Sequence, residues 1–100
     1  MAAVPVQDLD LGRVDAVEFM VRCDTQDEID RYWDALAEDG TIEQCGWVRD
    51  RYGLCWQIVP TVLQQMMADQ DRSKVKRVTE AFLQMKKLDI ATLQRAFDGT

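Results

Sequence analysis

The sequence contains no histidine, only three cysteines, and no long apolar run without charges. Without histidine, Ser-His and Cys-His nucleophilic catalysis are excluded, and the most common transition-metal ligand is absent. The cysteines, Cys23, Cys45 and Cys55, have no C-x-x-C spacing, which is typical of reduced thiols rather than of a disulfide framework or a zinc site. No apolar run approaches the ~20 residues that span a bilayer, and the start MAAVPVQDLDLGR lacks the features of a secretory signal. We therefore expect a cytoplasmic protein without a membrane partner.

The chain also lacks an excess of positive charge. It has 18 acidic and 12 basic residues and a net charge of −6. A nucleic-acid surface needs a basic stripe that displaces counterions, so we expect no nucleic-acid partner. A length of 100 residues with 47% hydrophobic residues fits one small globular domain. In a domain of this size, an exposed apolar sheet face would be covered by a partner.

The clearest local pattern is CGWVRDRYGLCWQIVP, residues 45–60. Apolar residues alternate on both sides of a turn that ends at Gly53, where a positive φ lets two strands return on each other. A one-residue bulge at Gly53 then sets the register of the hairpin. The expected cross-strand pairs are Trp47 with Gln57, Val48 with Trp56, and Arg49 with Cys55. The expected apolar face consists of Val48, Leu54, Trp56 and Ile58, and the expected mixed face of Trp47, Arg49, Cys55 and Gln57. Binding or chemistry would occur on the mixed face.

The remaining chain supplies the other elements of a small α+β domain. Alternation from Asp15 to Cys23 predicts one half-buried strand, with Phe19 on its core side. A capping box at Thr25-Gln26-Asp27-Glu28 opens a helix that Gly40 ends, and a short strand follows over 41–44. Together with the hairpin, which Pro60 ends, the predicted order is β-α-β-β-β.

Helices are expected after Pro60. One or two helical turns are predicted over 61–67, a longer helix begins after Asp71, and a last helix covers 90–97. The longer helix has an apolar stripe of Val75, Val78, Phe82 and Met85. The chain thus divides into an N-terminal arm (1–13), a βαβββ module (14–60) and a C-terminal helical extension (61–100).

This order of elements, with the strand-turn-strand WVRDRYGLCWQI, resembles the vicinal oxygen chelate superfamily of glyoxalase I, extradiol dioxygenases and bleomycin-resistance proteins. Within it, FMVRCDTQDEIDRYWDAL, QCGWVRDRYGLCWQIVP and FLQMKKLDIATLQRAF resemble the PhnB-like group, whose members are often labelled 3-demethylubiquinone-9 3-methyltransferase. The resemblance implies an α+β fold, with a single glyoxalase-like βαβββ module followed by C-terminal helices. Methyl transfer itself is not expected, because the chain has neither a Gly-rich dinucleotide-type fingerprint nor room for that fold.

Two departures from the family pattern bear on cofactors and partners. The metal-binding Glu of the superfamily falls on Gln57, and the usual first-strand His falls near 16–18, where there is none. A neutral amide is a poor replacement for a carboxylate at a divalent cation, so no cofactor and no metal site are predicted. Full members of the group have two modules in one chain, and this sequence corresponds to the second only. We therefore expect a homodimer, and a separate chain that supplies the first module is the alternative.

The candidate ligand-binding residues lie on the mixed face: Glu18, Arg22, Trp47, Arg49 and Gln57. Glu18 and Arg22 project from the same side of one strand and would bind a polar group or pair with Arg49. Trp47 is a candidate stacking wall or an interface residue, and Gln57 would hydrogen-bond a ligand or pack against Trp47. No catalytic residue is assigned, because Cys55 has Arg49 opposite it but no base.

The function predicted from the sequence is small-molecule binding by a PhnB-like module, with the reaction unassigned. One alternative is a metal-dependent enzyme of the glyoxalase or dioxygenase type, with carboxylates and Gln57 as ligands. The other is a non-catalytic interaction module whose C-terminal helices dock a partner. Exposure of the stripe on the longer helix would favour this last alternative.

Overall fold

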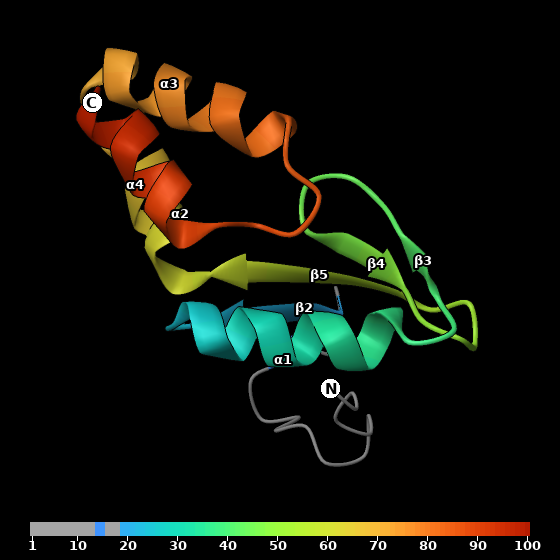
Figure 1. Ribbon diagram of the computed structural model, residues 1–100. Coiled ribbons are helices and arrows are strands. Elements are labelled where there is room, and N and C mark those ends of the chain that lie inside the picture. The colour runs from blue at the N-terminus through green and yellow to red at the C-terminus, as the bar shows by residue number, and fades with distance from the viewer. Residues whose placement is uncertain (1–13, 16–18) are drawn as a thin grey trace.

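A five-stranded mixed sheet, one helix on its apolar face and three C-terminal helices beyond its other face make up the described chain (Figure 1). The computed structural model describes residues 14–15 and 19–100, so the predicted arm over 1–13 lies outside the described residues. The elements are β1 (Val14–Asp15), β2 (Met20–Cys23), α1 (Gln26–Ala37), β3 (Thr41–Ile42), β4 (Trp47–Arg49), β5 (Cys55–Pro60), α2 (Thr61–Met67), α3 (Arg72–Leu83) and α4 (Ile90–Asp98). The predicted α+β class, with a βαβββ module followed by C-terminal helices, is confirmed.

The described strands lie in the order β1-β2-β5-β4-β3, and among them only β2 and β5 pair in parallel. The predicted β-α-β-β-β order corresponds to β2-α1-β3-β4-β5. The prediction of one strand from Asp15 to Cys23 was wrong, because β1 pairs antiparallel with β2, with Val14 opposite Val21. Phe19, just before β2, has a φ of 51° and is 39% exposed instead of facing the core. Its ring meets Trp56 edge-on at 5.5 Å between centroids.

The β4–β5 hairpin has the predicted register, with Trp47 opposite Gln57 and Arg49 opposite Cys55. Gly53 has a φ of 86°, and its N–H donates to the Asp50 carbonyl at 3.0 Å. The turn also depends on a contact that the sequence pattern did not predict.

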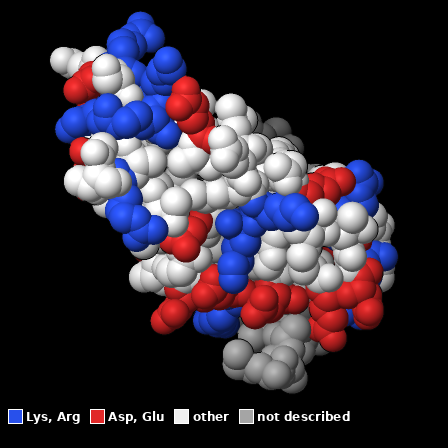
Figure 2. Space-filling model, turned by 45° about the horizontal axis from the view of Figure 1, so that its top comes forward, with Lys and Arg blue, Asp and Glu red and all other residues white. Residues whose placement is uncertain are grey.

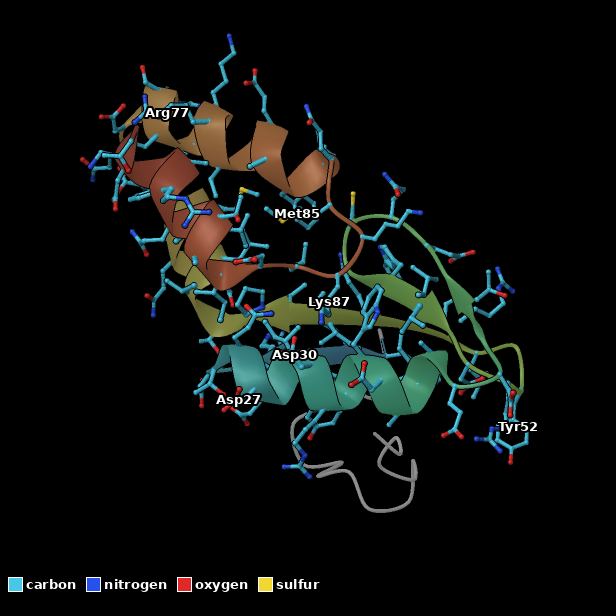
Figure 3. All side chains as sticks on the ribbon, viewed as in Figure 1. Asp27, Asp30, Tyr52, Arg77, Met85 and Lys87 are labelled. Atoms are coloured by element: carbon cyan, nitrogen blue, oxygen red, sulfur yellow. The ribbon has the colours of Figure 1, made fainter. Side chains whose placement is uncertain are left out.

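The Asp50 carboxylate, 7% exposed, accepts hydrogen bonds from the backbone N–H groups of Tyr52 and Leu54 and from the indole N–H of Trp56, all within 3.0 Å. Leu54 was expected on the buried apolar face, but its side chain is 46% exposed. Because β5 begins only at Cys55, strand alternation does not set the direction of the Leu54 side chain. Figure 3 shows Tyr52 at the outer tip of the hairpin.

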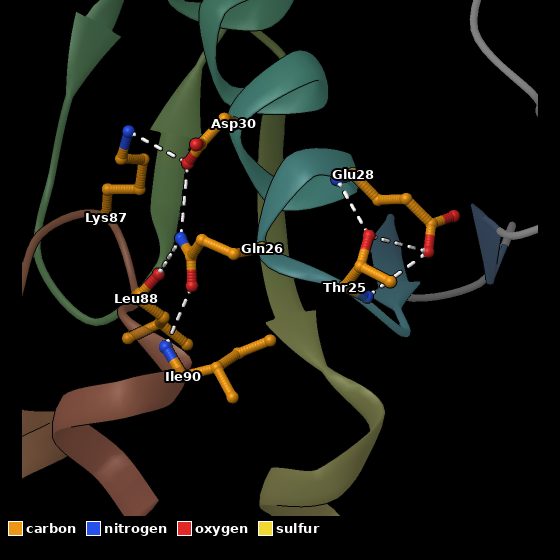
Figure 4. A network of polar contacts seen from close by, with 7 residues as sticks. All are labelled: Thr25, Gln26, Glu28, Asp30, Lys87, Leu88 and Ile90. Carbon is orange, nitrogen blue, oxygen red and sulfur yellow. Dashed lines mark hydrogen bonds and ion pairs between the residues drawn. The ribbon is translucent and has the colours of Figure 1, made fainter.

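The predicted capping box begins α1. The Thr25 hydroxyl accepts from the Glu28 N–H at 3.2 Å, and the Glu28 carboxylate accepts from the Thr25 N–H at 3.2 Å (Figure 4). The apolar side of α1 then packs on the apolar face of the sheet. The buried residues of this core are Val21, Cys23, Ile29, Tyr32, Trp33, Ala35, Leu36, Val48, Trp56 and Ile58.

The C-terminal helices have a second hydrophobic core of their own. Asp71 caps α3 by accepting from the Ser73 N–H at 2.9 Å, and Asp89 caps α4 by accepting from the Thr92 N–H at 3.1 Å. The buried residues of this core are Leu63, Met66, Val78, Leu88 and Leu93, with Phe82 and Met85 packed against them. Most of the predicted apolar stripe therefore packs inside the chain. Exposure of this stripe would have favoured a docking role, and that exposure is not found for Val78, Phe82 and Met85.

One side chain of α1 connects the two cores. The Gln26 amide donates to the Leu88 carbonyl at 3.0 Å and accepts from the Ile90 N–H at 2.8 Å (Figure 4). It also donates to Asp30, which forms an ion pair with Lys87 at 3.0 Å. The hydrogen bond and charge of Lys87 hold the pKa of the Asp30 carboxyl below its usual value, because both favour the ionised form. These contacts fix the segment before α4 against the start of α1.

Charge is unevenly distributed over the surface. Figure 2 shows Asp and Glu side chains gathered along the edge of the molecule that carries α1, and Lys and Arg side chains at the end formed by the C-terminal helices. In the described part of the chain, no helix has the length and apolar character needed to cross a bilayer.

We predict that Gln26→Ala lowers the free energy of unfolding by about 1–3 kcal/mol, because it leaves polar backbone groups at Leu88 and Ile90 without their partner. The matched control is Gln65→Ala on α2, where the side chain is exposed and makes no hydrogen bond within the described chain. The control should change stability by less than about 0.5 kcal/mol. Urea unfolding of the three proteins measures the difference, and equal losses for the two variants would contradict the role given to Gln26.

Candidate functional site

The mixed face of the sheet borders a cavity of about 330 Å³ beneath the C-terminal helices. The cavity lies between strands β2 and β5 on one side and helices α2 and α3 on the other. Its lining residues are Met20, Arg22, Gln57, Val59, Pro60, Thr61, Leu63, Gln64, Met67 and Phe82. Two of the five predicted ligand-binding residues, Arg22 and Gln57, thus line one cavity.

The sheet wall of this cavity follows from strand alternation and from the parallel register. In β2 and β5 the buried residues alternate with half-buried ones, which face away from α1. The β2–β5 pairing places Met20 beside Gln57 and Arg22 beside Val59. Four side chains from distant parts of the sequence therefore form one continuous surface.

The helical wall follows from the end of β5. Pro60 ends the strand and serves as the N-cap residue of α2, so the chain turns directly into a helix beside the mixed face. Leu63 and Met67, one turn apart on α2, and Phe82 on α3 then cover the cavity. These three residues were not predicted as part of a site. The only sequence signal for them was apolar spacing, which also fits core packing.

Gln57 is held by a hydrogen bond to a loop. Its side-chain N–H₂ group donates to the Cys45 carbonyl at 3.0 Å, and its backbone N–H donates to the Phe19 carbonyl at 3.1 Å. Cys45 has a φ of 60° and is followed by Gly46, with a φ of 82°. The 45–46 loop therefore sets the position of the Gln57 amide at the edge of the cavity.

The other candidate residues lie outside the cavity lining. Trp47 is opposite Gln57 on β4 and half-buried on the same face of the sheet. Arg49 is exposed and pairs with Glu43 at 3.7 Å, a solvated ion pair of small energetic value. Glu18 lies outside the described residues. The predicted mixed face therefore extends beyond the cavity, because Trp47 and Arg49 lie on this face but do not line the cavity.

The cavity is chemically suited to an apolar molecule with few polar groups. Its apolar surface comes from Met20, Val59, Leu63, Met67 and Phe82. Polar groups come from Arg22, Gln57, Gln64 and Thr61, whose hydroxyl donates to Asp24 at 2.8 Å. Such a lining is typical of small-ligand sites, in which a few polar atoms fix the orientation of an apolar body.

The same residues do not fit a metal ion. Among the described residues that line the cavity there is no carboxylate or thiolate, and two amides with a hydroxyl are weak donors for a divalent cation. Across the described residues, no three His, Cys, Asp or Glu side chains are grouped so that they could hold a metal. Cys55 lies opposite Arg49 on the mixed face and is half-buried. We assign it no chemical role.

Comparison with known families gives a match to about half of the chain. A sequence model of the family described as 3-demethylubiquinone-9 3-methyltransferase matches residues 8–59. The match includes α1 and the described sheet up to the last residues of β5, and it ends before α2. No curated protein matches the chain.

We predict that Gly46→Ala destabilises the protein more than Gly53→Ala does. Both glycines have a positive φ, of 82° and 86°, so both substitutions have the same backbone cost of about 1–2 kcal/mol. A Cβ at Gly46 would lie 2.8 Å from the Ile58 carbonyl oxygen and 3.2 Å from Leu88, whereas a Cβ at Gly53 meets nothing within 4 Å. The extra loss at Gly46, about 1–3 kcal/mol by overpacking, is measured by urea unfolding. Equal losses would contradict the close packing of the 45–46 loop.

Proposed function

Because this chain belongs to the 3-demethylubiquinone-9 3-methyltransferase family of glyoxalase-like domains, we propose that it binds a small, largely apolar molecule in the cavity on the mixed face of its sheet. The observation that carries the proposal is the composition of the cavity, an apolar surface with Arg22 and Gln57 at its sheet wall. The proposed role is binding rather than methyl transfer. Methyl-donor sites of the dinucleotide-binding type lie at the end of a parallel sheet, whereas this sheet has one parallel pair among antiparallel ones.

The size of the cavity supports a ligand of one or two rings. A volume of about 330 Å³ is close to the lower end of the ~300–1,000 Å³ found for small-molecule pockets. Met20 and Met67 lie in its lining, and their unbranched side chains adapt to ligands of different shape. Arg22 and Gln57, from neighbouring strands, would then orient the polar end of the ligand.

We also propose that the protein acts as a homodimer. The mixed face continues past the cavity to the half-buried Trp47 on β4. Within the described chain, β3 forms an edge of the sheet with no further strand paired to it. An open sheet edge and a half-buried aromatic residue beside it favour association with a second copy, which would cover the part of the mixed face that the C-terminal helices leave free.

Ligand binding is tested by NMR with isotope-labelled methionine methyl groups and β-naphthol as the probe. We expect the methyl signals of Met20 and Met67, which line the cavity, to shift during the titration. The signal of Met85 is the internal control, because this residue packs in the second core and does not line the cavity. Shifts of all these methyl groups alike, or no shift at Met20 and Met67, would contradict binding at this place.

The dimer is tested by light scattering and by unfolding at several concentrations. We expect a dimer mass at micromolar protein and an unfolding midpoint that falls on dilution, because association stabilises the folded state by mass action. Trp47→Lys should weaken the dimer, since it places a charge on the uncovered part of the mixed face. The control, Tyr52→Lys, changes a residue that is 78% exposed at the hairpin tip and should leave the dimer unchanged. A monomer mass with a midpoint independent of concentration would rule out the homodimer.

A further inference from the structure

We infer that the Gln57 side chain selects a ligand that carries a hydrogen-bond donor, such as a hydroxyl or N–H group, over a ligand of the same shape that has only acceptors. The inference rests on the proposed binding function of the cavity and adds the chemical class of its ligand. It depends on which end of the Gln57 amide is available to the cavity.

The first step is that the Cys45 carbonyl has a fixed direction. This carbonyl and the N–H of Gly46 belong to one planar trans peptide unit, so the direction of one sets the direction of the other. The Gly46 N–H donates to the Lys86 carbonyl at 2.8 Å, and the Cys45 N–H donates to the Met85 carbonyl at 2.7 Å. On the other side, the Gly46 carbonyl accepts from the Ile58 N–H at 2.8 Å. Backbone hydrogen bonds therefore hold the loop on both sides of this peptide.

The second step is that this carbonyl orients the Gln57 amide. A carbonyl oxygen only accepts hydrogen bonds, so only the N–H₂ end of the amide can face it. This is the observed arrangement, in which Gln57 Nε2 donates to the Cys45 oxygen at 3.0 Å. The amide oxygen Oε1 is then the end of the amide that has no partner in the loop, whereas the second N–H belongs to the nitrogen that the Cys45 carbonyl holds. Within the described chain Oε1 makes no hydrogen bond, and Gln57 lines the cavity.

The third step concerns what a bound molecule must offer to Oε1. The neighbours of Gln57 on the sheet wall are the apolar side chains of Met20 and Val59. A ligand hydroxyl or N–H would satisfy the oxygen as it displaces water. An ether or carbonyl at the same place would leave two acceptors facing each other, which costs the desolvation energy of both.

The same contact discriminates between an amide and a carboxylate at this position. Both oxygens of a carboxylate are acceptors, so a Glu side chain in the same conformation would face the fixed Cys45 carbonyl with like partial charge. The Cys45 carbonyl therefore favours an amide over a carboxylate at position 57. The amide presents the ligand with an uncharged acceptor, Oε1, rather than an anionic one.

The test compares β-naphthol with its methyl ether, which has the same rings and oxygen but no O–H donor. Isothermal titration calorimetry of the wild-type protein should show a preference of about threefold to tenfold for β-naphthol, the range expected for one neutral hydrogen bond. Gln57→Met, which keeps the length of the side chain but removes the amide, should bind both probes equally. The matched control is Gln65→Met, at an exposed glutamine of α2 outside the cavity lining, which should keep the preference.

The outcomes separate this inference from the proposed function. If the wild-type protein binds both probes with equal affinity, or if Gln57→Met keeps the preference as Gln65→Met does, donor selection by Gln57 is overturned and ligand binding by the cavity stands. If the wild-type protein binds neither probe, the proposed function fails and the inference fails with it. The comparison of the two probes on the wild-type protein needs no variant, so poor folding of Gln57→Met would not prevent the decision.

Discussion

The parallel pairing of β2 with β5 is the constraint on which the rest of the structure depends. Parallel strands cannot be joined by a tight turn, and the chain between these two includes α1, β3 and β4. Because α1 packs on the apolar face through Ile29 and Leu36, the residues between the buried ones project from the opposite face. The register that aligns Val21 with Ile58 in the core also aligns Met20 with Gln57 in the cavity. One set of backbone hydrogen bonds therefore positions both the core and the candidate site.

The C-terminal helices complete the cavity because the extension is attached to the module at two places. At the first, Pro60 passes directly from β5 into α2. At the second, the segment before α4 buries Leu88 and is bonded to Gln26 and to the 45–46 loop. Between these two attachments lie α2 and α3, which together with α4 pack mainly on one another, with Val78 and Leu93 fully buried among the three helices. Phe82 can close the cavity only because the attachments hold this second core against the sheet.

The elements that could be predicted from the sequence are those with a local physical cause. The capping box at Thr25, the hairpin register set by Gly53 and the cap of α3 by Asp71 each depend on residues within a few positions of one another. The division of the predicted first strand into β1 and β2 was missed. Apolar residues alternate with period two both in one long strand and in two short strands, so the pattern does not distinguish the two cases. The helical wall of the cavity was missed for a related reason. Spacing identifies the apolar side of α2 and α3 but not the surface that it will cover. Strand periodicity predicted that Arg22 and Gln57 lie on the mixed face, whereas the same periodicity could not show where along the face the cavity ends.

The extension contributes more to the cavity than its lining residues indicate. Only Phe82 reaches the cavity from the part of the chain beyond α2. However, the carbonyls of Met85 and Lys86 hold the loop that contains Cys45 and Gly46, and the Cys45 carbonyl orients Gln57. Backbone groups that follow α3 thus determine which end of the Gln57 amide, on β5, faces the 45–46 loop. In this arrangement the matched family segment supplies the amide, and the residues after it determine which atom of that amide faces the loop.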